Sequence, residues 1–305
     1  MTTAWTAQRR RRARWFLVAL VVGVLAVTAV SFFLIVPTRP DDVLLARPVE
    51  GRDQSLEIQG VFRNLDAASA TVSLNLSFQP AGELAGPSGP STDLSVLVLG
   101  ASTNSSLSFT EADPMRPVTV SVPLTGSRVT RYPFDKYRTR LVIAAGTADG
   151  EAIPVVLNLS ANLNDFRASS RTSAESADTE GVDVTATFQR NGAVLIWAGT
   201  LGLLFWTLAA GAVMIGWIVI AHNQAVPIWS WAYLAGVLFA LPNLRNGLPG
   251  TPPFGSLVDW GAFYWSVAVT GSVLFALLTT WFQRQRHAIA EATRAAEAAH
   301  ANEPD

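Results

Sequence analysis

The sequence predicts an α+β membrane protein, with an extracytoplasmic antiparallel β-sandwich-like domain plus four transmembrane helices. Three observations lead to this prediction: long charge-free apolar runs at both ends, a middle segment that alternates polar and apolar residues, and a low charge content. Of the 305 residues, 50% are apolar and only 15% are charged, whereas an ordinary soluble domain has about 25% charged residues. Cysteine is absent, which excludes disulfide frameworks and thiolate chemistry.

The first apolar run covers residues 15–36 and follows a cytoplasmic basic tail, residues 1–14, which contains five closely spaced arginines. A helix of 22 residues spans about 33 Å, enough for a hydrocarbon core of about 30 Å. A cleaved signal peptide is the alternative, but its apolar region is usually shorter and ends at small residues. We therefore predict an uncleaved transmembrane helix with the arginines on the cytoplasmic side.

Three further apolar runs lie near the C-terminus, and the shortest of them is also open to interpretation as a re-entrant or buried helix. Four crossings place both basic ends of the chain in the cytoplasm, as the positive-inside rule requires. The predicted location is the plasma membrane, with multiple passes and both termini cytoplasmic. The predicted segments are an extracytoplasmic β-domain at 37–191, transmembrane helices at 193–220, 225–241 and 257–282, an external Pro/Gly loop at 242–256 and a cytoplasmic tail at 283–305.

The segment 37–191 alternates polar and apolar side chains with a period of two, which is typical of half-buried strands. The alternation is plain in TVSLNLSF at 71–78 and in VTVSVPL at 118–124. No helical period separates these runs, so we expect antiparallel strands in a sandwich. The polar segment 167–181 is expected to form a mobile loop before the last strand.

Catalytic machinery is not apparent in the external segment. The three histidines, His222, His287 and His300, all fall on the predicted cytoplasmic side, which excludes Ser-His-Asp hydrolysis, Cys-His chemistry and typical zinc sites outside. The sequence contains no P-loop, dinucleotide fingerprint or metalloprotease motif. We expect no enzyme activity, no cofactor, and no catalytic, cofactor-binding or metal-binding residues. Residues 37–191 carry 13 basic and 18 acidic side chains, so nucleic acid is not an expected partner.

The densest motif is Arg-Tyr-Pro-Phe-Asp-Lys-Tyr, in which the candidate structural residues are Tyr132, Pro133, Phe134 and Asp135. Proline fixes φ, Phe134 is expected to fill the core, and Asp135 is expected to accept hydrogen bonds from backbone N–H groups of the turn. These features predict a rigid corner before a strand at 137–144. A binding epitope is the alternative.

Residues 241–255, which cover nearly all of the external Pro/Gly loop, contain four prolines and three glycines in 15 residues, which predicts a stiff, non-helical connector. Arg245 is the only basic residue between Arg190 and Arg284, and a basic residue outside departs from the positive-inside rule. We predict that Arg245 pairs with Asp259 or with an acid of the external domain, and that it couples the β-domain to the spans. A contact with headgroup phosphates is the alternative. The candidate coupling residues here are Arg245, Asn246, Pro249, Gly250, Pro252, Pro253 and Asp259.

Small residues spaced four apart in the predicted spans predict close approach of neighbouring helices. These pairs are Thr207/Gly211, Ala212/Gly216 and Ala232/Gly236.

Two motifs together resemble the domain-of-unknown-function 4436 family of actinobacterial and fungal membrane proteins. They are Tyr-Pro-Phe-Asp-Lys-Tyr before a strand and Leu-Arg-Asn-x-x-Pro-Gly-x-Pro-Pro-x-Gly-x-x-x-Asp between the last two spans. The resemblance covers about residues 50–282 and implies one N-terminal span, an external β-domain and three C-terminal spans. It implies no particular biochemistry.

The Tyr-Pro-Phe-Asp motif is also similar to a Phe-Pro-Phe-Asp turn of pentameric ligand-gated channels, which join an external β-sandwich to four spans. This sequence departs from those channels because one span precedes the external domain and the flanking cysteines are missing.

We therefore expect a non-enzymatic envelope or accessory protein of the plasma membrane, whose external β-domain binds a protein or envelope component. A ligand-responsive channel or transporter subunit is the first alternative, and a membrane enzyme is the second. The expected partners are the lipid bilayer and an unknown membrane or envelope protein, and homo-oligomerisation is left open.

Overall fold

The protein is described here from a computed structural model, which describes residues 42–46, 54–102, 105–126, 128–172, 181–222 and 224–301. The predicted basic tail at 1–14 and the predicted first transmembrane helix at 15–36 lie outside the described residues. The chain divides into two compact units. The β-domain falls within Met1–Val129 and Phe134–Ile196, and the helical unit falls within Thr130–Pro133 and Trp197–Asp305.

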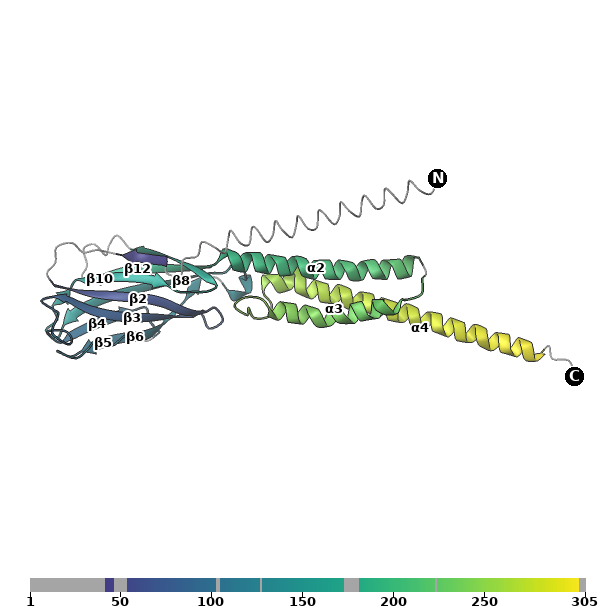
Figure 1. The fold of residues 1–305 in the computed structure, drawn as a ribbon, viewed down its shortest axis with the longest axis horizontal. Coiled ribbons are helices and arrows are strands. Elements are labelled where there is room, and N and C mark those ends of the chain that lie inside the picture. Colours follow the sequence, from purple (N-terminus) through teal and green to yellow (C-terminus); the bar gives the residue numbers. More distant parts are fainter. Residues whose placement is uncertain are drawn as a thin grey trace, which may run out of the picture. The chain divides into compact units, whose positions relative to one another are not determined.

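The β-domain consists of two sheets. The strands are β1 (Asp42–Ala46), β2 (Gln54–Asp66), β3 (Thr71–Gly82), β4 (Leu94–Leu99), β5 (Ser105–Phe109), β6 (Val118–Pro123), β7 (Thr125–Gly126), β8 (Lys136–Thr147), β9 (Ala152–Ile153), β10 (Val155–Ala161), β11 (Phe166–Thr172) and β12 (Gly181–Arg190). One sheet has the order β1-β10-β2-β3-β6, and the other has the order β11-β12-β8-β4-β5, with β7 and β9 paired to β8. Figure 1 labels strands of both sheets. The predicted α+β class is confirmed.

Strand formation follows the period-two alternation of the sequence. In β12, for example, every second side chain from Val182 to Arg190 is buried. The sheets are largely antiparallel, as predicted, but β10 and β2 pair in parallel, from Val155↔Leu56 to Ala161↔Phe62.

The expectation of a loop at 167–181 is wrong for its first part. Residues 167–172 belong to β11, which pairs with β12 from Phe166↔Arg190 to Thr172↔Val184. β11 is an edge strand of its sheet. An edge strand tolerates polar and charged side chains because much of its surface faces solvent. Residues 173–180 lie outside the described residues.

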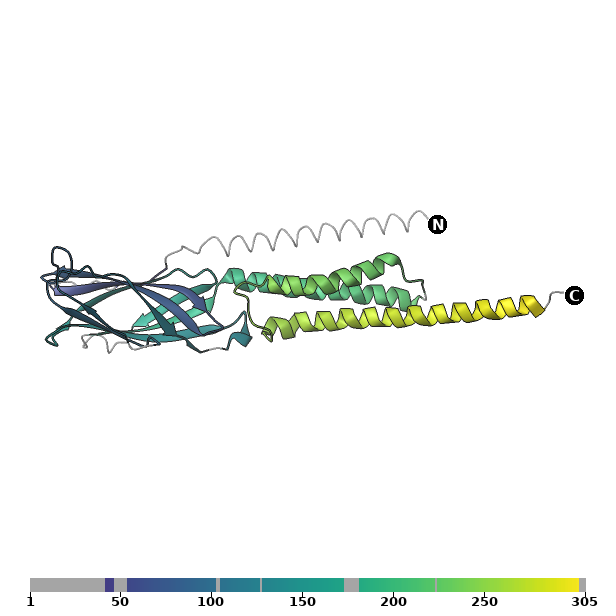
Figure 2. The same ribbon diagram turned by 90° about the horizontal axis from the view of Figure 1, so that it is seen from below.

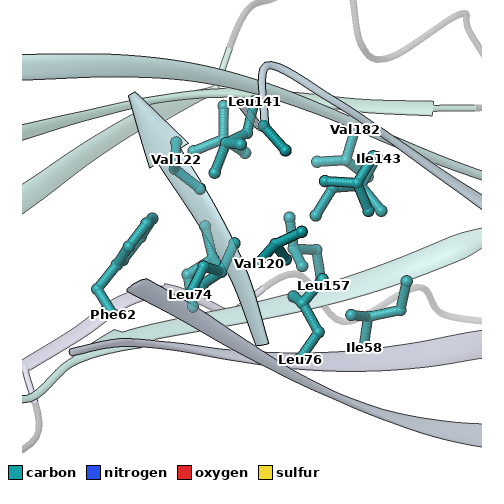
Figure 3. Close-up of a cluster of buried hydrophobic side chains, with 14 of the residues drawn as sticks. Ile58, Phe62, Leu74, Leu76, Val120, Val122, Leu141, Ile143, Leu157 and Val182 are labelled. Carbon is teal, nitrogen blue, oxygen red and sulfur yellow. The ribbon is translucent and has the colours of Figure 1, made fainter. Parts of the chain in front are cut away.

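The core of the β-domain lies between the two sheets. Figure 3 shows side chains from one sheet pointing toward side chains from the other, among them Phe62 and Leu74 opposite Leu141 and Ile143. Each of these four side chains is at most 1% exposed. The ring of Phe62 also packs edge-on against Phe188, with centroids 5.2 Å apart. Full burial of such a side chain contributes about 1.5–3 kcal/mol, so this core supplies a rigid frame for the loops.

The helical unit is formed by α2 (Gly192–Ala221), α3 (Ile228–Asn246), the π-helical turn η3 (Asp259–Phe263) and α4 (Tyr264–Ala301). Figures 1 and 2 show α2, α3 and α4 side by side, with α4 extending beyond the other two. Asn191 caps the start of α2, because its Oδ1 accepts a hydrogen bond of 2.9 Å from the backbone N–H of Val194.

Two helical segments among the described residues are long and apolar enough to span a membrane: α2, and η3 with most of α4, Asp259–Arg294. The third predicted span, α3, is not among them, because Asn243, Arg245 and Asn246 near its end lower the mean hydropathy of its 19 residues. The described residues therefore support two candidate spans, and the prediction of four is not supported by them.

The prediction that the chain becomes non-helical at residue 242 is wrong, because α3 continues to Asn246 with Pro242 inside it. A proline in a helix removes one backbone donor. The carbonyl that loses its helical donor is that of Leu238. The side chain of Asn243 bonds within the same turn, since its Nδ2 donates to the backbone carbonyl of Phe239 at 3.2 Å. Gly247 then closes the helix, with its N–H donating to the carbonyls of Asn243 and Leu244. The last turn of α3 thus presents Arg245 from a rigid helix.

Candidate functional site

The candidate site of the helical unit is built on an ion pair between Arg245 in α3 and Asp259 at the start of η3. Arg245 is 5% exposed and Asp259 is fully buried. Nε of Arg245 donates to Oδ1 of Asp259 at 3.0 Å, and Nη2 donates to Oδ2 at 3.0 Å. Two parallel bonds of this kind fix the guanidinium and carboxylate planes relative to each other. The sequence analysis considered several partners for Arg245, and in the structure its partner is Asp259.

The connector between α3 and η3 closes around this pair. Nη2 of Arg245 also donates to the carbonyl of Pro252 at 2.7 Å. The backbone N–H groups of Gly255 and Ser256 donate to Oδ2 of Asp259 at 2.9 and 3.1 Å. The guanidinium carbon lies 4.1 Å from the centre of the Phe254 ring, which is a cation–π contact. We call these residues the arginine clamp: Arg245, Pro252, Phe254, Gly255, Ser256 and Asp259.

Local sequence explains why the connector takes this path. Gly250 and Gly255 have φ values of +68° and +93°, in the region that side chains with a Cβ disfavour. Ser256 and Asp259 cap each other reciprocally, because the backbone N–H of Asp259 also donates to Oγ of Ser256 at 3.4 Å. This is a capping box, with an acid three residues after a serine at the start of a helix.

The clamp is chemically closed. The carboxylate of Asp259 accepts hydrogen bonds from two guanidinium nitrogens and two backbone N–H groups. A buried carboxylate with this many donors and an opposite charge beside it is an anchor for its surroundings. The arrangement fixes the two helix ends and the connector rather than presenting a free acid or base.

Not every predicted residue of this region takes part. The clamp brings together Arg245, Pro252 and Asp259, whereas Asn246, Pro249, Gly250 and Pro253 lie in the connector or at the end of α3 and make none of its hydrogen bonds. Sequence reasoning did not single out Phe254 or Ser256. The Ser-x-x-Asp spacing was the available signal for Ser256, and Phe254 gave none.

The second predicted site, the Tyr-Pro-Phe-Asp corner, is held by an arginine that the sequence analysis did not assign. Asp135 and Arg190 are 1% and 7% exposed, and Nε of Arg190 lies 3.2 Å from each carboxylate oxygen of Asp135. Nη1 of Arg190 also lies 3.9 Å from Asp165, and the guanidinium covers the ring of Phe166 at 4.1 Å. The alternation of β12 could have indicated this arginine, because it places Arg190 among the buried side chains of the strand.

Two expectations for this corner need correction. Phe134 is 63% exposed and does not fill the core, whereas Tyr132 is completely buried. Asp135 accepts its hydrogen bonds from the Arg190 side chain and not from the turn backbone as expected. A buried arginine competes successfully for the carboxylate because a charged donor bonds more strongly than a neutral amide. The peptide bond between Tyr132 and Pro133 is cis.

Tyr137 lies beside this pair and is 2% exposed. Burial raises the pKa of its phenol, and the neighbouring Asp135 carboxylate raises the pKa further, against a smaller opposing effect of Arg190. Burial and the Asp135 carboxylate both disfavour the phenolate. Tyr137 is therefore a neutral hydroxyl within a buried charged cluster.

An acidic pocket lies at the end of the sandwich opposite to Arg190, where β8 ends at Thr147. Its volume is about 520 Å³. Asp93 already accepts a hydrogen bond of 2.7 Å from the backbone N–H of Glu111. Among the described residues, no group of three or more His, Cys, Asp or Glu side chains is arranged to hold a metal ion. The pocket is lined by the carboxylates of Glu83, Asp93, Glu111, Asp149 and Glu151 without a lysine or arginine.

The division of the chain into a β-rich part and a helical part agrees with comparison to protein families. Residues 46–187 match the domain of unknown function DUF4436. Residues 190–284 match a second family model, the domain of unknown function DUF8686. The DUF4436 match supports the family resemblance of the Tyr-Pro-Phe-Asp-Lys-Tyr motif, which lies within it. The arginine clamp lies within the DUF8686 match. No curated protein matches the chain.

Proposed function

We propose that this chain is a multi-pass accessory protein of the plasma membrane, whose external DUF4436 domain binds a protein or envelope component that presents a cationic group. The observation that carries the membrane part is the surface of the helical unit. Leu203 of α2, Phe239 of α3 and Phe275 of α4 are 68%, 77% and 69% exposed. A water-soluble bundle would turn such side chains inward.

The charges of this unit support the same proposal. Arg245 and Asp259 are buried and neutralise each other, which is the arrangement that charged residues adopt within lipid. By composition alone, the charge of Arg245 argues against α3 as a membrane span. Because its charge is paired inside the unit while Phe239 faces outward, we propose that α3 crosses the membrane together with α2 and α4. With the apolar run at 15–36, this gives four spans and cytoplasmic termini.

Cysteine labelling tests this topology, since the natural chain has no cysteine. We expect an impermeant thiol reagent on intact cells to label Ser88→Cys and Thr251→Cys, and to label His222→Cys only after permeabilisation. The pair Thr251 and His222 flanks α3, so labelling of both from the same side would show that α3 does not cross. Labelling of His222→Cys but not Ser88→Cys would reverse the orientation.

The acidic pocket supports the binding part of the proposal, because its five carboxylates favour a cationic partner group. A photo-crosslinking residue at Thr92, which lines the pocket, should give an adduct in cells. The same residue at Ala68, which is exposed at the other end of β2, is the matched control. The adduct should disappear when Asp149→Asn and Glu151→Gln are combined. An adduct that survives these changes, or that forms equally at Ala68, would show that the pocket does not select the partner.

A further inference from the structure

Two buried hydroxyl groups in α4 have no hydrogen-bond partner within the described part of the chain. Ser266 and Thr270 are fully buried, and neither Oγ of Ser266 nor Oγ1 of Thr270 makes a hydrogen bond. A buried hydroxyl without a partner costs about 1–3 kcal/mol. In native proteins such groups are rare, and an ordered water is a common reason for the exceptions.

Other hydroxyls of the same unit show that these two are unusual. Thr207, Thr279 and Thr280 each bond to a backbone carbonyl of their own helix, at 2.8, 2.9 and 2.7 Å. This local bond is the ordinary solution for a hydroxyl in an apolar helix. Ser266 and Thr270 do not use it, so their hydrogen-bonding capacity is available to another molecule.

The two hydroxyls lie in line with the buried polar residues of the arginine clamp along the same segment, with the buried apolar residues Ala262 and Phe263 between them. Ser256 and Asp259 are fully buried, as are Ser266 and Thr270 further along the same segment. Four residues of helix rise about 6 Å, so one water between Ser266 and Thr270 is able to bond to both hydroxyls. Buried waters typically make about three hydrogen bonds, and helix carbonyls supply further acceptors.

Beyond Thr270 the buried side chains of the unit become apolar. Leu277 of α4 is fully buried in a cluster with Leu234 of α3 and Val219 of α2. An apolar cluster of this kind stays dry. The apolar cluster therefore bounds the two hydroxyls on one side, and Ala262 and Phe263 separate them from the clamp on the other. Ser230 of α3, which is also buried without a partner, lies beyond the cluster and is not part of this line.

We propose that the helical unit contains an internal water site at Ser266 and Thr270, which is reached from the end of the unit that carries the arginine clamp and is closed at the other end by the Leu277 cluster. The ligand is water, and any small hydrophilic solute that follows it reaches the same hydroxyls. The proposal rests on the membrane topology proposed above, because in lipid the only water near mid-span is water held inside the unit.

Accessibility of single cysteines tests this proposal in the full chain in membranes. Ser266→Cys and Thr270→Cys replace a hydroxyl by a thiol of similar size. The matched control is Thr207→Cys, whose parent side chain is exposed on the outer surface of α2 and bonds to its own helix. A small hydrophilic thiosulfonate reacts with thiolates, which form only in contact with water. We expect modification to be many-fold faster at positions 266 and 270 than at position 207. The extent of modification is measured from the mass of the intact protein.

The outcomes separate the two proposals. Silence at positions 266, 270 and 207 would overturn the water site and leave the membrane topology standing. Reaction at position 207 as fast as at the other two would mean that the unit is not embedded in lipid, which overturns both. Thr270→Val gives a second measurement that needs no reagent. If water bonds to the hydroxyl, this change lowers the melting temperature in detergent; an unchanged or higher melting temperature means a dry hydroxyl and overturns the site.

Discussion

Arg245 and Asp259 are 14 residues apart in the chain, yet their side chains form two parallel hydrogen bonds of 3.0 Å inside the helical unit. The carboxylate also accepts the backbone N–H groups of Gly255 and Ser256. The pair therefore joins the end of one helix, the connector and the start of the next helix. Its contribution depends on both partners being present, because either alone is a buried charge.

We predict that Arg245→Ala and Asp259→Ala each destabilise the helical unit by about 3–5 kcal/mol, the usual effect of breaking a buried ion pair. The double variant should cost clearly less than the sum of the two, since it leaves no uncompensated charge. The stability of Arg245→Lys should lie between those of wild type and Arg245→Ala, because an ammonium group keeps the charge but cannot form the two parallel bonds. Thermal unfolding in detergent measures all four variants, including the double one. Strict additivity would show that the two side chains do not act together.

The buried pair Arg190–Asp135 has a matched control on the neighbouring strands. Arg140 and Asp183 also form a side-on pair, with Nη2 and Oδ2 of the two side chains 2.6 Å apart, but the Arg140 side chain is 71% exposed. We predict that Arg190→Ala destabilises the β-domain by about 3–5 kcal/mol and Arg140→Ala by about 0–1 kcal/mol. Denaturant unfolding of the full chain, followed by a β-domain probe, compares them. Equal effects would mean that burial does not determine how much these ion pairs contribute to stability.

The sequence predicted the strands because burial of one sheet face imposes a period of two. It predicted β3 and β12 well, since each has one apolar and one polar face. β11 was missed because an edge strand is held mainly by backbone pairing with β12, which leaves little trace in side-chain polarity. The parallel pairing of β10 with β2 depends on contacts between residues far apart in the chain, for which local periodicity carries no signal.

The same contrast applies to the candidate sites. Arg245 and Asp259 stood out because a charge near apolar runs needs a partner, and only a few acids were within reach. Phe254 and the corner partner Arg190 were missed, because a ring over a guanidinium and an ion pair across 55 residues are properties of the folded chain. Phe134 was predicted to fill the core because it is apolar, but it is 63% exposed, whereas Tyr132 is completely buried.

Tyr137 predicts a dependence of stability on high pH. Its pKa is raised above the ordinary value of 10.0 by burial and by Asp135, so the folded chain keeps the phenolic proton where the unfolded chain has lost it. The stabilising effect is complete below the ordinary pKa and is lost as the pH rises from there toward the raised value. Tyr137→Phe should have a melting temperature that falls less steeply above about pH 10. Parallel curves for the two proteins would exclude Tyr137 as the titrating group.

Glycines on two faces of the helical unit give the last prediction, which revises the expectation that all the small-residue pairs mark tight packing. A Cβ on Gly211 would lie 2.3 Å from the hydroxyl of Tyr233, which donates to the carbonyl of Leu208 at 3.0 Å. A Cβ on Gly236 would meet nothing within 4 Å. Alanine at position 211 must displace the Tyr233 ring and break that bond, so Gly211→Ala should destabilise the unit by about 1–3 kcal/mol.

Gly236→Ala is the matched control for that variant, with the same added methyl group in the middle of a neighbouring helix. It should be neutral or stabilising by up to about 1 kcal/mol, because alanine restricts the unfolded chain more than glycine does. The melting temperatures of the two variants in detergent should therefore move in opposite directions from wild type. If both melting temperatures fall equally, the surface of α3 around Gly236 is covered by another helix. The candidates are the segment 15–36 and a second copy of the chain. Crosslinking from position 236 would distinguish them.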